Sequence, residues 1–381
     1  MATSSPERAI PSIAILGSRG IPARYGGFER FAEEISVRLA ARGVEIAVYA
    51  EGESDSRERT YRGVRIIPIR PVRCGPLSTI IFDLRCLIHA SRRYSVIYML
   101  GYGAAIFFPF VRCPLWVNMD GLEWSRAKWR WAGRTWLRVM EGIALRFARL
   151  VICDAEAIET SLRKRHGDSF RANYVPYGAT IEKGQPDDAV LAHFGLTAGG
   201  YHLVVCRIEP ENHVLEILQG FLSCRANSSL VIVGDVATAN RYHRQVARFA
   251  SERIRFLGAV YDASVLRALR FHCAAYCHGH SVGGTNPSLL EAMASGNIVV
   301  AHDNVFNREV CGEDGLYWRT FVDLGARLLE AESMNQPNRE ALGTRMRARV
   351  SERYDWEKVV DRYVAFLREE IERSVRAGAS A

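Results

Sequence analysis

Two glycine-rich loops of this sequence combine residue types that bind phosphate or sugar groups. The first, Gly17-Ser-Arg-Gly-Ile-Pro-Ala-Arg-Tyr-Gly-Gly27, follows a short apolar run and precedes apolar residues at helical spacing. Glycines let the backbone approach another group closely, and the N–H groups at a helix N-terminus attract anions. The loop lacks both a P-loop signature and the Gly-x-Gly-x-x-Gly fingerprint. A phosphate cradle and an ordinary strand-to-helix turn are therefore equally compatible with it.

The second loop, Ser281-Val-Gly-Gly-Thr-Asn-Pro-Ser-Leu-Leu-Glu291, joins another strand-like run to a helix that we expect to begin near Asn286 or Pro287. Free backbone N–H groups at such a helix start form an anion site. Glu291 would lie one turn inside the helix, where its carboxylate can accept hydrogen bonds from sugar hydroxyls. The structural alternative is helix capping by Asn286 with Pro287 at the first helical position, and both readings can hold together.

Single charged residues follow two other predicted strands. Asp120 lies in Asn118-Met-Asp-Gly-Leu-Glu-Trp124 at the carboxyl end of a strand, where α/β proteins bind ligands. Capping of the next helix is the structural alternative for Asp120. Arg207 lies in Arg207-Ile-Glu-Pro-Glu-Asn212, after a strand of the second half. Its guanidinium can hold a diphosphate in fork geometry, although an arginine at such a place is weak information by itself.

The segment Phe271-His-Cys-Ala-Ala-Tyr-Cys-His-Gly-His280 contains two cysteines and three histidines. Their spacing matches no zinc pattern, and Cys273 and Cys277 lie within or beside a strand-like run. We therefore favour buried thiols with loop histidines over a metal site. The chain also lacks an Asp-x-Asp motif, so cations and helix dipoles would have to neutralise any bound diphosphate.

Strand-like runs alternate with amphipathic helical patterns, which is typical of parallel α/β domains. In the first half the runs are Ile13–Gly17, Val44–Tyr49, Val64–Ile69, Val96–Leu100, Leu115–Asn118 and Leu150–Cys153. The pattern restarts after the polar stretch Glu182–Asp188, with Leu203–Cys206, Leu230–Val233, Arg255–Leu257, Ala274–Cys277 and Ile298–Ala301. These units predict two Rossmann-like domains, residues 1–180 and 181–354, with a cleft between them. Residues 355–375 predict one amphipathic helix.

Composition and charge narrow the function class. The chain has 381 residues, 48% hydrophobic and 24% charged, which excludes a disordered, collagen-like or coiled-coil protein. The net charge of +8 is modest beside that of a dedicated nucleic-acid binder. Residues 1–180 carry 27 basic and 17 acidic residues, a net of +10, whereas the remainder carries −2. The two halves are therefore expected to face different partners, or the first to face an anionic surface.

Several sequence features indicate where in the cell the protein is found. The nine scattered cysteines indicate reduced thiols, and the polar first eleven residues do not resemble a signal peptide. The apolar run Tyr94–Val111 is broken by glycines and a proline, which predicts strand, turn and helix rather than a membrane span.

Residues 124–149 hold Trp124, Trp129, Trp131 and Trp136 with seven basic residues and one acid, Glu141. This mixture suits a membrane headgroup interface; a nucleic-acid surface and an ordinary helix with core tryptophans are the alternatives.

A resemblance to a known family enters with the second loop. His278-Gly-His-Ser-Val-Gly-Gly-Thr-Asn-Pro-Ser-Leu-Leu-Glu-Ala-Met293, with Ala301-His-Asp-Asn-Val-Phe-Asn-Arg-Glu309, resembles a bacterial branch of the retaining glycosyltransferases of family 4. This branch is best known for rhamnosyltransferases of surface polysaccharide assembly. The stretches Gly17–Glu29, Asp120–Trp124 and Arg207–Asn212 resemble the same branch, so the likeness covers nearly the whole chain. It implies a GT-B fold, with two Rossmann-like domains, a central cleft and a C-terminal helix crossing back to the first.

The resemblance also implies roles for individual residues. The nucleotide-sugar donor would lie on the second domain and the acceptor on the first. Arg207 would contact the donor diphosphate and Glu291 the ribose. Backbone N–H groups of Gly284, Thr285 and Asn286 would meet the diphosphate or the donor sugar, and the Gly26-Gly27 turn would approach the phosphates from the opposite domain. Three positions depart from the wider family, which has Glu at Gly283, Lys at Asn212 and His at Asp120. We expect Asn212 and Gly283 among the donor-binding residues and Asp120 among the catalytic ones, while the contacts that these three residues make with the donor sugar stay open.

The chemistry implied is front-face substitution, in which the leaving diphosphate oxygen takes the acceptor proton. Arg207 and the helix beginning near Asn286 would stabilise that leaving group, and Asp120 would steady positive charge on the sugar or orient the acceptor hydroxyl. We expect a retaining hexosyltransferase that needs no metal and no cofactor. Its donor would be dTDP-L-rhamnose, and it would transfer L-rhamnose to a lipid-linked saccharide. We expect it in the cytoplasm, peripheral on the inner face of the cytoplasmic membrane, and not on nucleic acid.

Other functions are compatible with the same residues. The same fold could use a UDP- or GDP-hexose donor. A nucleotide-sugar epimerase of related architecture would convert the donor with no acceptor present. A non-enzymatic basic protein could bind a membrane surface or nucleic acid, but such a binder has no need of a near-neutral second half with a glycine-rich anion loop.

Overall fold

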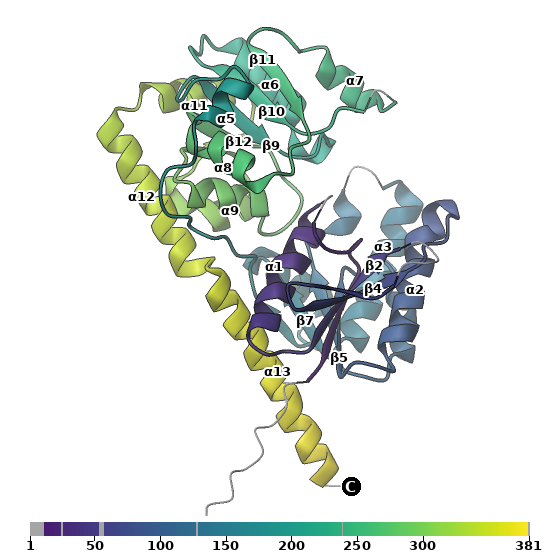
Figure 1. The fold of residues 1–381 in the computed structure, drawn as a ribbon. Helices are drawn as coiled ribbons and strands as arrows, with labels where there is room; N and C mark the ends of the chain where they lie inside the picture. Colours follow the sequence, from purple (N-terminus) through teal and green to yellow (C-terminus); the bar gives the residue numbers. More distant parts are fainter. Residues whose placement is uncertain (1–10, 24–25, 53–56, 127–128, 238, 380–381) are drawn as a thin grey trace, which may run out of the picture.

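Two α/β domains and a long terminal helix make up the chain (Figure 1). The computed structural model describes residues 11–23, 26–52, 57–126, 129–237 and 239–379. Outside them lie residues 1–10, which include most of the predicted polar N-terminus, and Lys128 of the tryptophan-rich segment. Arg24 and Tyr25 of the first glycine-rich loop lie outside them as well.

The first domain is built on one eight-stranded sheet. Its strands are β1 (Ile13–Leu16), β2 (Ile46–Glu51), β3 (Arg59–Tyr61), β4 (Val64–Ile69), β5 (Val96–Leu100), β6 (Leu115–Met119), β7 (Leu150–Cys153) and β8 (Ala172–Tyr174). Its helices are α1 (Gly27–Ala41), α2 (Ser78–Ala90), α3 (Trp131–Phe147) and α4 (Glu156–His166), with the 3₁₀ turns η1 (Gly75–Leu77), η2 (Ala105–Phe110) and η3 (Glu123–Ser125). The strand order is β3-β4-β2-β1-β5-β6-β7-β8, and only the β3–β4 pair is antiparallel.

The second domain repeats this plan with six parallel strands in the order β11-β10-β9-β12-β13-β14. They are β9 (Tyr201–Val205), β10 (Ser229–Val233), β11 (Ile254–Gly258), β12 (Ala275–His278), β13 (Val299–His302) and β14 (Leu316–Trp318). The helices are α5 (Ala189–His193), α6 (Val214–Ser223), α7 (Arg241–Ala247), α8 (Ala263–Phe271), α9 (Pro287–Ala294), α10 (Val305–Cys311), α11 (Phe321–Ser333), α12 (Gln336–Arg353) and α13 (Trp356–Ala379), with the 3₁₀ turns η4 (Pro210–Asn212) and η5 (Gly312–Asp314).

The central strands are apolar along their whole length because helices cover both faces of each sheet. All four residues of β1 are buried, as are all of β5, β6 and β7. Parallel strands present their carboxyl ends at one sheet edge. Gly17, Gly101, Asp120 and Asp154 each follow one of these four strands, so the topology brings them to the same edge.

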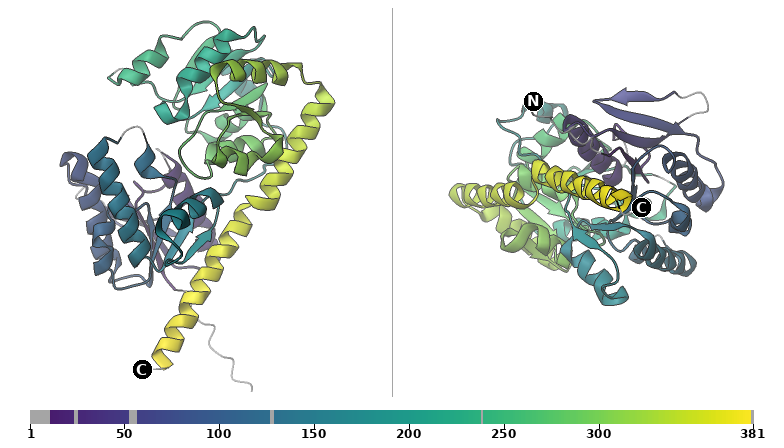
Figure 2. Two further views of the ribbon diagram at one scale, coloured as in Figure 1. Left: turned by 180° about the vertical axis from the view of Figure 1, so that it is seen from behind. Right: turned by 90° about the horizontal axis from the view of Figure 1, so that it is seen from below.

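The helix α13 leaves the second domain and runs along the first, as Figure 2 shows. Near its start, the Trp356 ring packs on Phe31 of α1 at a centroid distance of 6.2 Å. Further along, the hydroxyl of Tyr363 hydrogen bonds that of Tyr98 on β5 at 2.8 Å. The aromatic side of the helix is therefore buried against the first domain, which confirms the predicted helix that crosses back.

The predicted strand runs are confirmed, with boundaries that differ by one or two residues. Three short strands were missed: β3, β8 and β14, each of three residues. None of these strands is buried along its whole length, and β3 is an edge strand with polar residues. Their sequences therefore show no apolar pattern that would predict a strand. The run Tyr94–Val111 forms β5 and η2, as predicted. Within the described residues, no helix combines the length and apolarity needed to cross a bilayer.

Candidate active site

A cleft of about 2050 Å³ separates the two domains. Its walls come from the strand ends and helix N-termini of both sheets, the place where open α/β sheets bind ligands. Residues predicted from sequence line it from both sides: Gly26, Gly27, Asp120, Arg207, Asn212, Gly284, Thr285, Asn286 and Glu291. Gly283 does not line the cleft and instead touches the opposite domain.

The glycine-rich loop before α9 contacts the strand ends of the first domain. A Cβ atom added at Gly121 would lie 2.5 Å from the Cα of Gly283. One added at Gly284 would lie 2.1 Å from Oδ1 of Asp154. The hydroxyl of Thr285 donates a hydrogen bond to the backbone carbonyl of Asp154. The two domains therefore meet through a backbone contact that only glycine permits.

Asp120 and Asp154 form a pair of carboxyl groups at this contact. Met119 on β6 pairs with Cys153 on β7. Asp120 and Asp154, which follow these two residues, therefore lie side by side at the carboxyl edge of the sheet. Burial raises the pKa of Asp120 and raises the pKa of Asp154 further; for Asp154 the neighbouring Asp120 charge adds to the rise. At least one of these carboxyl groups therefore keeps its proton to a higher pH than an ordinary aspartate does.

Two arginines place positive charge beside this pair. Arg126 is buried and lies 3.9 Å from Asp120 through Nη2 and 2.6 Å from Glu123 through Nε. Arg207 follows β9 on the opposite domain and also acts electrostatically on Asp120. Both guanidinium groups line the cleft. An anionic group entering here would therefore meet cations from both domains.

Asn212 holds two other site residues in place. Its amide nitrogen donates to the backbone carbonyl of Arg207 at 2.7 Å. Its amide oxygen lies 2.7 Å from Nδ1 of His280, which must therefore carry the proton of that ring. Burial and the nearby charges of Arg126 and Arg207 lower the pKa of His280 well below its ordinary value. A neutral His280 thus presents an unprotonated Nε2 at the site, and Asn212 acts as a positioning residue.

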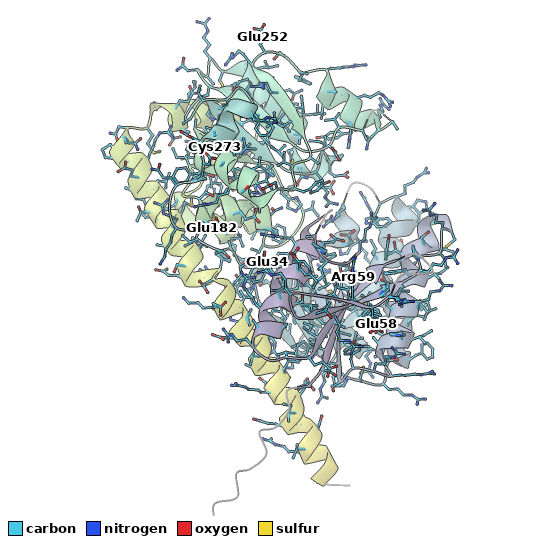
Figure 3. The ribbon with its side chains drawn as sticks, viewed as in Figure 1. Glu34, Glu58, Arg59, Glu182, Glu252 and Cys273 are labelled. Atoms are coloured by element: carbon cyan, nitrogen blue, oxygen red, sulfur yellow. The ribbon has the colours of Figure 1, made fainter. Side chains whose placement is uncertain are left out.

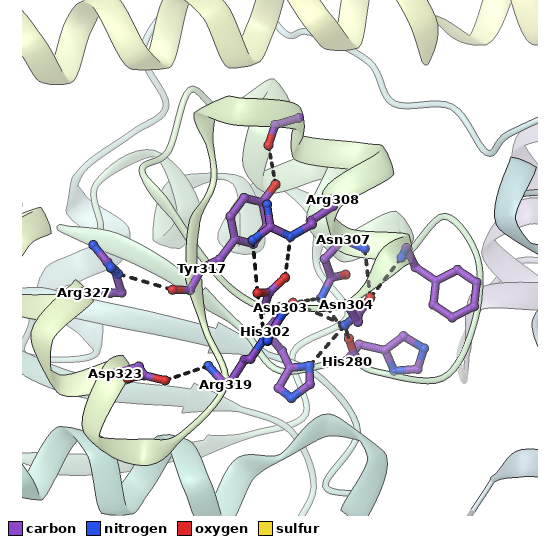
Figure 4. A network of polar contacts seen from close by, with 12 residues as sticks. His280, His302, Asp303, Asn304, Asn307, Arg308, Tyr317, Arg319, Asp323 and Arg327 are labelled. Atoms are coloured by element: carbon purple, nitrogen blue, oxygen red, sulfur yellow. Dashed lines mark hydrogen bonds and ion pairs between the residues drawn. The ribbon is translucent and has the colours of Figure 1, made fainter.

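The backbone of His280 is fixed by the polar network in Figure 4. The side-chain amides of Asn304 and Asn307 donate to the carbonyl of His280 at 3.0 and 2.9 Å. Asn304 also caps α10 by accepting from the N–H groups of the next turn. Asp303 beside it bridges two arginines of the second domain, Arg308 and Arg319. This network holds the loops after β12 and β13 in register at the cleft.

The start of α9 has the predicted cap. Asn286 is the N-cap and its side chain accepts from the N–H of Ser288 at 3.0 Å, with Pro287 in the first turn. Glu291, one turn later, is held by Arg270 at 2.7 Å and by Arg30 of the first domain at 3.7 Å. The capping interpretation is therefore confirmed, and Glu291 additionally joins the domains across the cleft.

The first loop ends in helix α1, whose N-cap is Gly26. No side chain caps this helix start among the described residues. Two glutamates of α1 instead hold the preceding loop, since Glu29 accepts from the N–H of Arg19 at 3.0 Å and Glu33 from that of Ala23 at 2.8 Å. The N-terminus of α1 thus lines the cleft from the first domain. Figure 3 labels Glu34 of α1 and Glu182, which also line the cleft.

Sequence reasoning missed four residues that the fold brings to this site. They are Arg126, Asp154, Arg270 and His280. Asp154 directly follows a predicted strand, as Asp120 does, so the same strand-end argument could have found it. For His280 the sequence predicted a loop histidine, in preference to a metal ligand, and no place in the site. Among the described residues, no group of three or more His, Cys, Asp or Glu side chains has the geometry to hold a metal ion. Cys277 and His278 are instead buried in β12.

Comparisons with known families divide the chain at the same place as its two sheets. Residues 10–180 match a domain of unknown function, DUF1972. Residues 201–330 match the family described as Glycosyl transferases group 1. The second domain is a glycosyl transferase group 1 domain. No curated protein matches the sequence.

Solved structures share the whole architecture. Sucrose-phosphate synthase from Thermosynechococcus elongatus superposes with a TM-score of 0.79, at 18% identity over 95% of this chain and 99% of that one. HepE from Anabaena in complex with UDP-glucose gives 0.76, at 19% identity over 94% and 100%. A UDP-forming trehalose-phosphate synthase from Burkholderia vietnamiensis gives 0.72, at 13% identity over 95% and 99%. The expected GT-B fold is thereby confirmed.

Proposed function

We propose that this protein is a retaining glycosyltransferase that moves a hexose from a nucleotide sugar to a lipid-linked saccharide without a metal ion. The observation that carries the proposal is the convergence of Arg207, Arg126 and the α9 N-terminus on one cleft of a GT-B fold whose second domain belongs to the group 1 glycosyl transferases. A diphosphate leaving group develops negative charge, and preorganised cations and helix N–H groups stabilise it.

In this mechanism the donor diphosphate lies between Arg207 and the start of α9. The departing oxygen takes the proton of the acceptor hydroxyl on the same face of the sugar, so configuration is retained. Asp120 lies across the cleft, where a carboxylate would steady positive charge on the sugar ring. Burial and the charge of Glu123 oppose ionisation of that carboxylate, whereas Arg126, Arg207 and a hydrogen bond with Asp154 favour it.

The donor is the finer part of the proposal. We propose dTDP-L-rhamnose, from the resemblance of the second loop to the rhamnosyltransferase branch. UDP-hexoses are the second candidate, since HepE of Anabaena, similar in fold, was solved with UDP-glucose. The two candidates differ in base and sugar, and both leave a nucleoside diphosphate.

A thermal-shift panel tests this assignment, since a ligand that binds the native state raises its melting temperature. We expect dTDP-L-rhamnose to raise the Tm of the protein more than UDP-glucose or GDP-mannose does, with EDTA present throughout. Stabilisation by UDP-glucose alone would favour the second candidate. No stabilisation by any nucleotide sugar would contradict the glycosyltransferase proposal. Epimerised donor formed without an acceptor would indicate an epimerase.

The acceptor proposal rests on a surface of the first domain that we call the aromatic–basic surface. It comprises Ile106 and Phe110 of η2, Trp131 and Val139 of α3, and the exposed Arg130, Arg134 and Arg138. Phe110 is 78% and Trp131 80% exposed, and η2 packs against α3. Apolar rings beside arginines fit an anionic lipid headgroup region. We therefore place the protein on the cytoplasmic face of the membrane, where a lipid-linked acceptor would be presented.

A further inference from the structure

Asp83 is a buried carboxyl group that the proposed mechanism does not use. It lies in the second turn of α2 and is 5% exposed. A helix between two parallel strands runs antiparallel to them, so its N-terminal turns lie at the carboxyl edge of the sheet. Asp83 therefore lies at the same edge as Asp120, and it lines the cleft.

Among the described residues, one oxygen of the Asp83 carboxyl group, Oδ1, lacks the hydrogen bond that a buried polar atom requires. Burial raises the pKa of Asp83 to about 7. A buried carboxyl oxygen without a partner destabilises the native state. A contribution to stability therefore does not explain why an aspartate occupies this position. Cys86, one turn later on α2, is fully buried in the apolar core, so the side of α2 that carries Asp83 continues into that core.

Apolar and aromatic side chains of α2, of the segment around α3 and of the loop after β5 line the same cleft as Asp83. They are Ile80 and Phe82 of α2, Tyr102, and Trp129 and Trp136 beside or on α3. The Trp136 indole N–H donates to the carbonyl of Gly103 at 3.1 Å, which fixes the ring between α3 and the loop after β5. Aromatic side chains with a few precisely placed polar groups are typical of small-molecule sites. We call this part of the cleft the α2–α3 groove.

We propose that Asp83 binds a hydroxyl group of the acceptor saccharide in the α2–α3 groove. This inference rests on the proposed function, since it assigns the acceptor to one wall of that cleft. A phosphate is the wrong ligand, because the carboxylate would repel a second anion and no cation of the described residues offsets the burial of Asp83. A neutral hydroxyl suits both states of Asp83, donating to the carboxylate or accepting from the acid.

The position of the groove agrees with the route of a lipid-linked acceptor. Trp136 is 37% exposed and lies on α3, the helix that also carries Trp131 of the aromatic–basic surface. The lipid end of such an acceptor would remain at that surface while its sugar enters the groove. The hydroxyl held by Asp83 would then orient the saccharide toward the donor.

Binding of octyl glycosides tests the proposal on the intact protein. The probes are octyl glucoside, octyl mannoside and octyl N-acetylglucosaminide below their micelle concentrations, followed by tryptophan fluorescence. Asp83→Leu keeps the branched shape of the side chain, with a larger volume, and removes the hydrogen bond. Asp83→Asn keeps both shape and size and replaces the charged carboxylate with a neutral amide. We expect Asp83→Leu to weaken binding of at least one glycoside about tenfold, the effect of losing one charge-assisted hydrogen bond. An octyl polyethylene glycol ether, which has no sugar, should bind both forms equally.

Stability separates a binding role from a structural one. If Asp83 serves binding, Asp83→Leu and Asp83→Asn should keep or raise the Tm, and the exposed Asp168→Asn control should change neither property. Unchanged glycoside binding in both Asp83 variants, or a wild type that binds none of the three glycosides, would overturn the proposal. A marked loss of Tm in both variants would also overturn it. Nucleotide-sugar stabilisation, measured on the same variants, reports on the proposed function separately.

Discussion

The carboxyl groups of Asp120 and Asp154 interact at the ends of adjacent strands, and Gly284 of the other domain lies directly against Asp154. Two carboxyl groups so placed cannot both ionise without repulsion, so one keeps its proton as pH rises. Burial raises the pKa of Asp154, and repulsion by Asp120 raises it further. The protonation state of the site is thus linked to the contact between the domains.

This pair predicts a pH dependence of stability. The pKa of Asp154 is higher in the native state than its ordinary value of 3.8 in the unfolded chain. The contribution of this group to stability is therefore fully present below pH 3.8 and is lost as the pH rises through the pKa of the native state. Asp154→Asn removes the titration while keeping a hydrogen-bonding group. We expect its unfolding free energy to fall less than that of the wild type as pH rises from about 4 toward 8, in chemical denaturation at several pH values. Equal slopes in wild type, Asp154→Asn and the exposed Asp168→Asn control would contradict the retained proton.

Asp120→Asn tests the catalytic part of the same pair. The variant keeps the shape of the side chain and loses the charge that would steady the sugar ring. We expect kcat to fall roughly 10²-fold, with nucleotide-sugar affinity nearly unchanged, measured by product formation and thermal shift. Full turnover in Asp120→Asn would show that its charge has no part in the reaction.

Arg207→Ala should remove one of the two guanidinium groups that face an entering diphosphate. The expected loss in kcat is about 10²- to 10³-fold, since preorganised groups at a developing anion supply that much. Arg225→Ala, an exposed arginine of the same domain outside the cleft, is the matched control and should retain full turnover. Similar losses in both variants would point to a general charge effect and against a diphosphate contact at Arg207.

Gly284→Ala should separate the domains, because the new methyl group would meet the Asp154 carboxyl at 2.1 Å. The cost of such overpacking is about 1–3 kcal/mol of unfolding free energy. Gly27→Ala is the control, since a Cβ at Gly27 meets no described atom within 4 Å. Combining Gly284→Ala with Asp154→Ala should restore much of the lost stability in denaturant titrations. Additive losses in the double variant would argue that Gly284 and Asp154 do not contact each other.

Vesicle sedimentation tests the aromatic–basic surface. The protein should bind vesicles rich in anionic lipid, and added salt should weaken that binding by screening the arginines. Phe110→Ser with Trp131→Ser should reduce the bound fraction at least several-fold, since both apolar rings are withdrawn from the interface. Phe321→Ser, at a 43% exposed position of the second domain, should bind like the wild type. Equal binding to neutral vesicles at high salt would count against this surface.

Local sequence patterns determined the parts of the molecule that depend on neighbouring residues. Buried strands such as Leu150–Cys153 are continuous apolar runs, and the cap of α9 follows from Asn286 and Pro287. Strand ends such as Asp120 could be assigned to a sheet edge because parallel strands share that edge. The two-domain plan and the cleft position of most predicted site residues therefore follow from the order of residues along the chain.

The tertiary structure decided which of these residues meet. Gly283 was expected in the donor site, yet it packs on Gly121 of the first domain, and Asp154 becomes a partner of Asp120 only because β6 and β7 are neighbours. The four tryptophans of residues 124–149 also differ in burial: Trp131 and Trp136 are exposed, whereas Trp124 and Trp129 are partly buried. Sheet order and domain contact join residues far apart in the chain, and side-chain burial follows from that packing, so no local pattern could specify them.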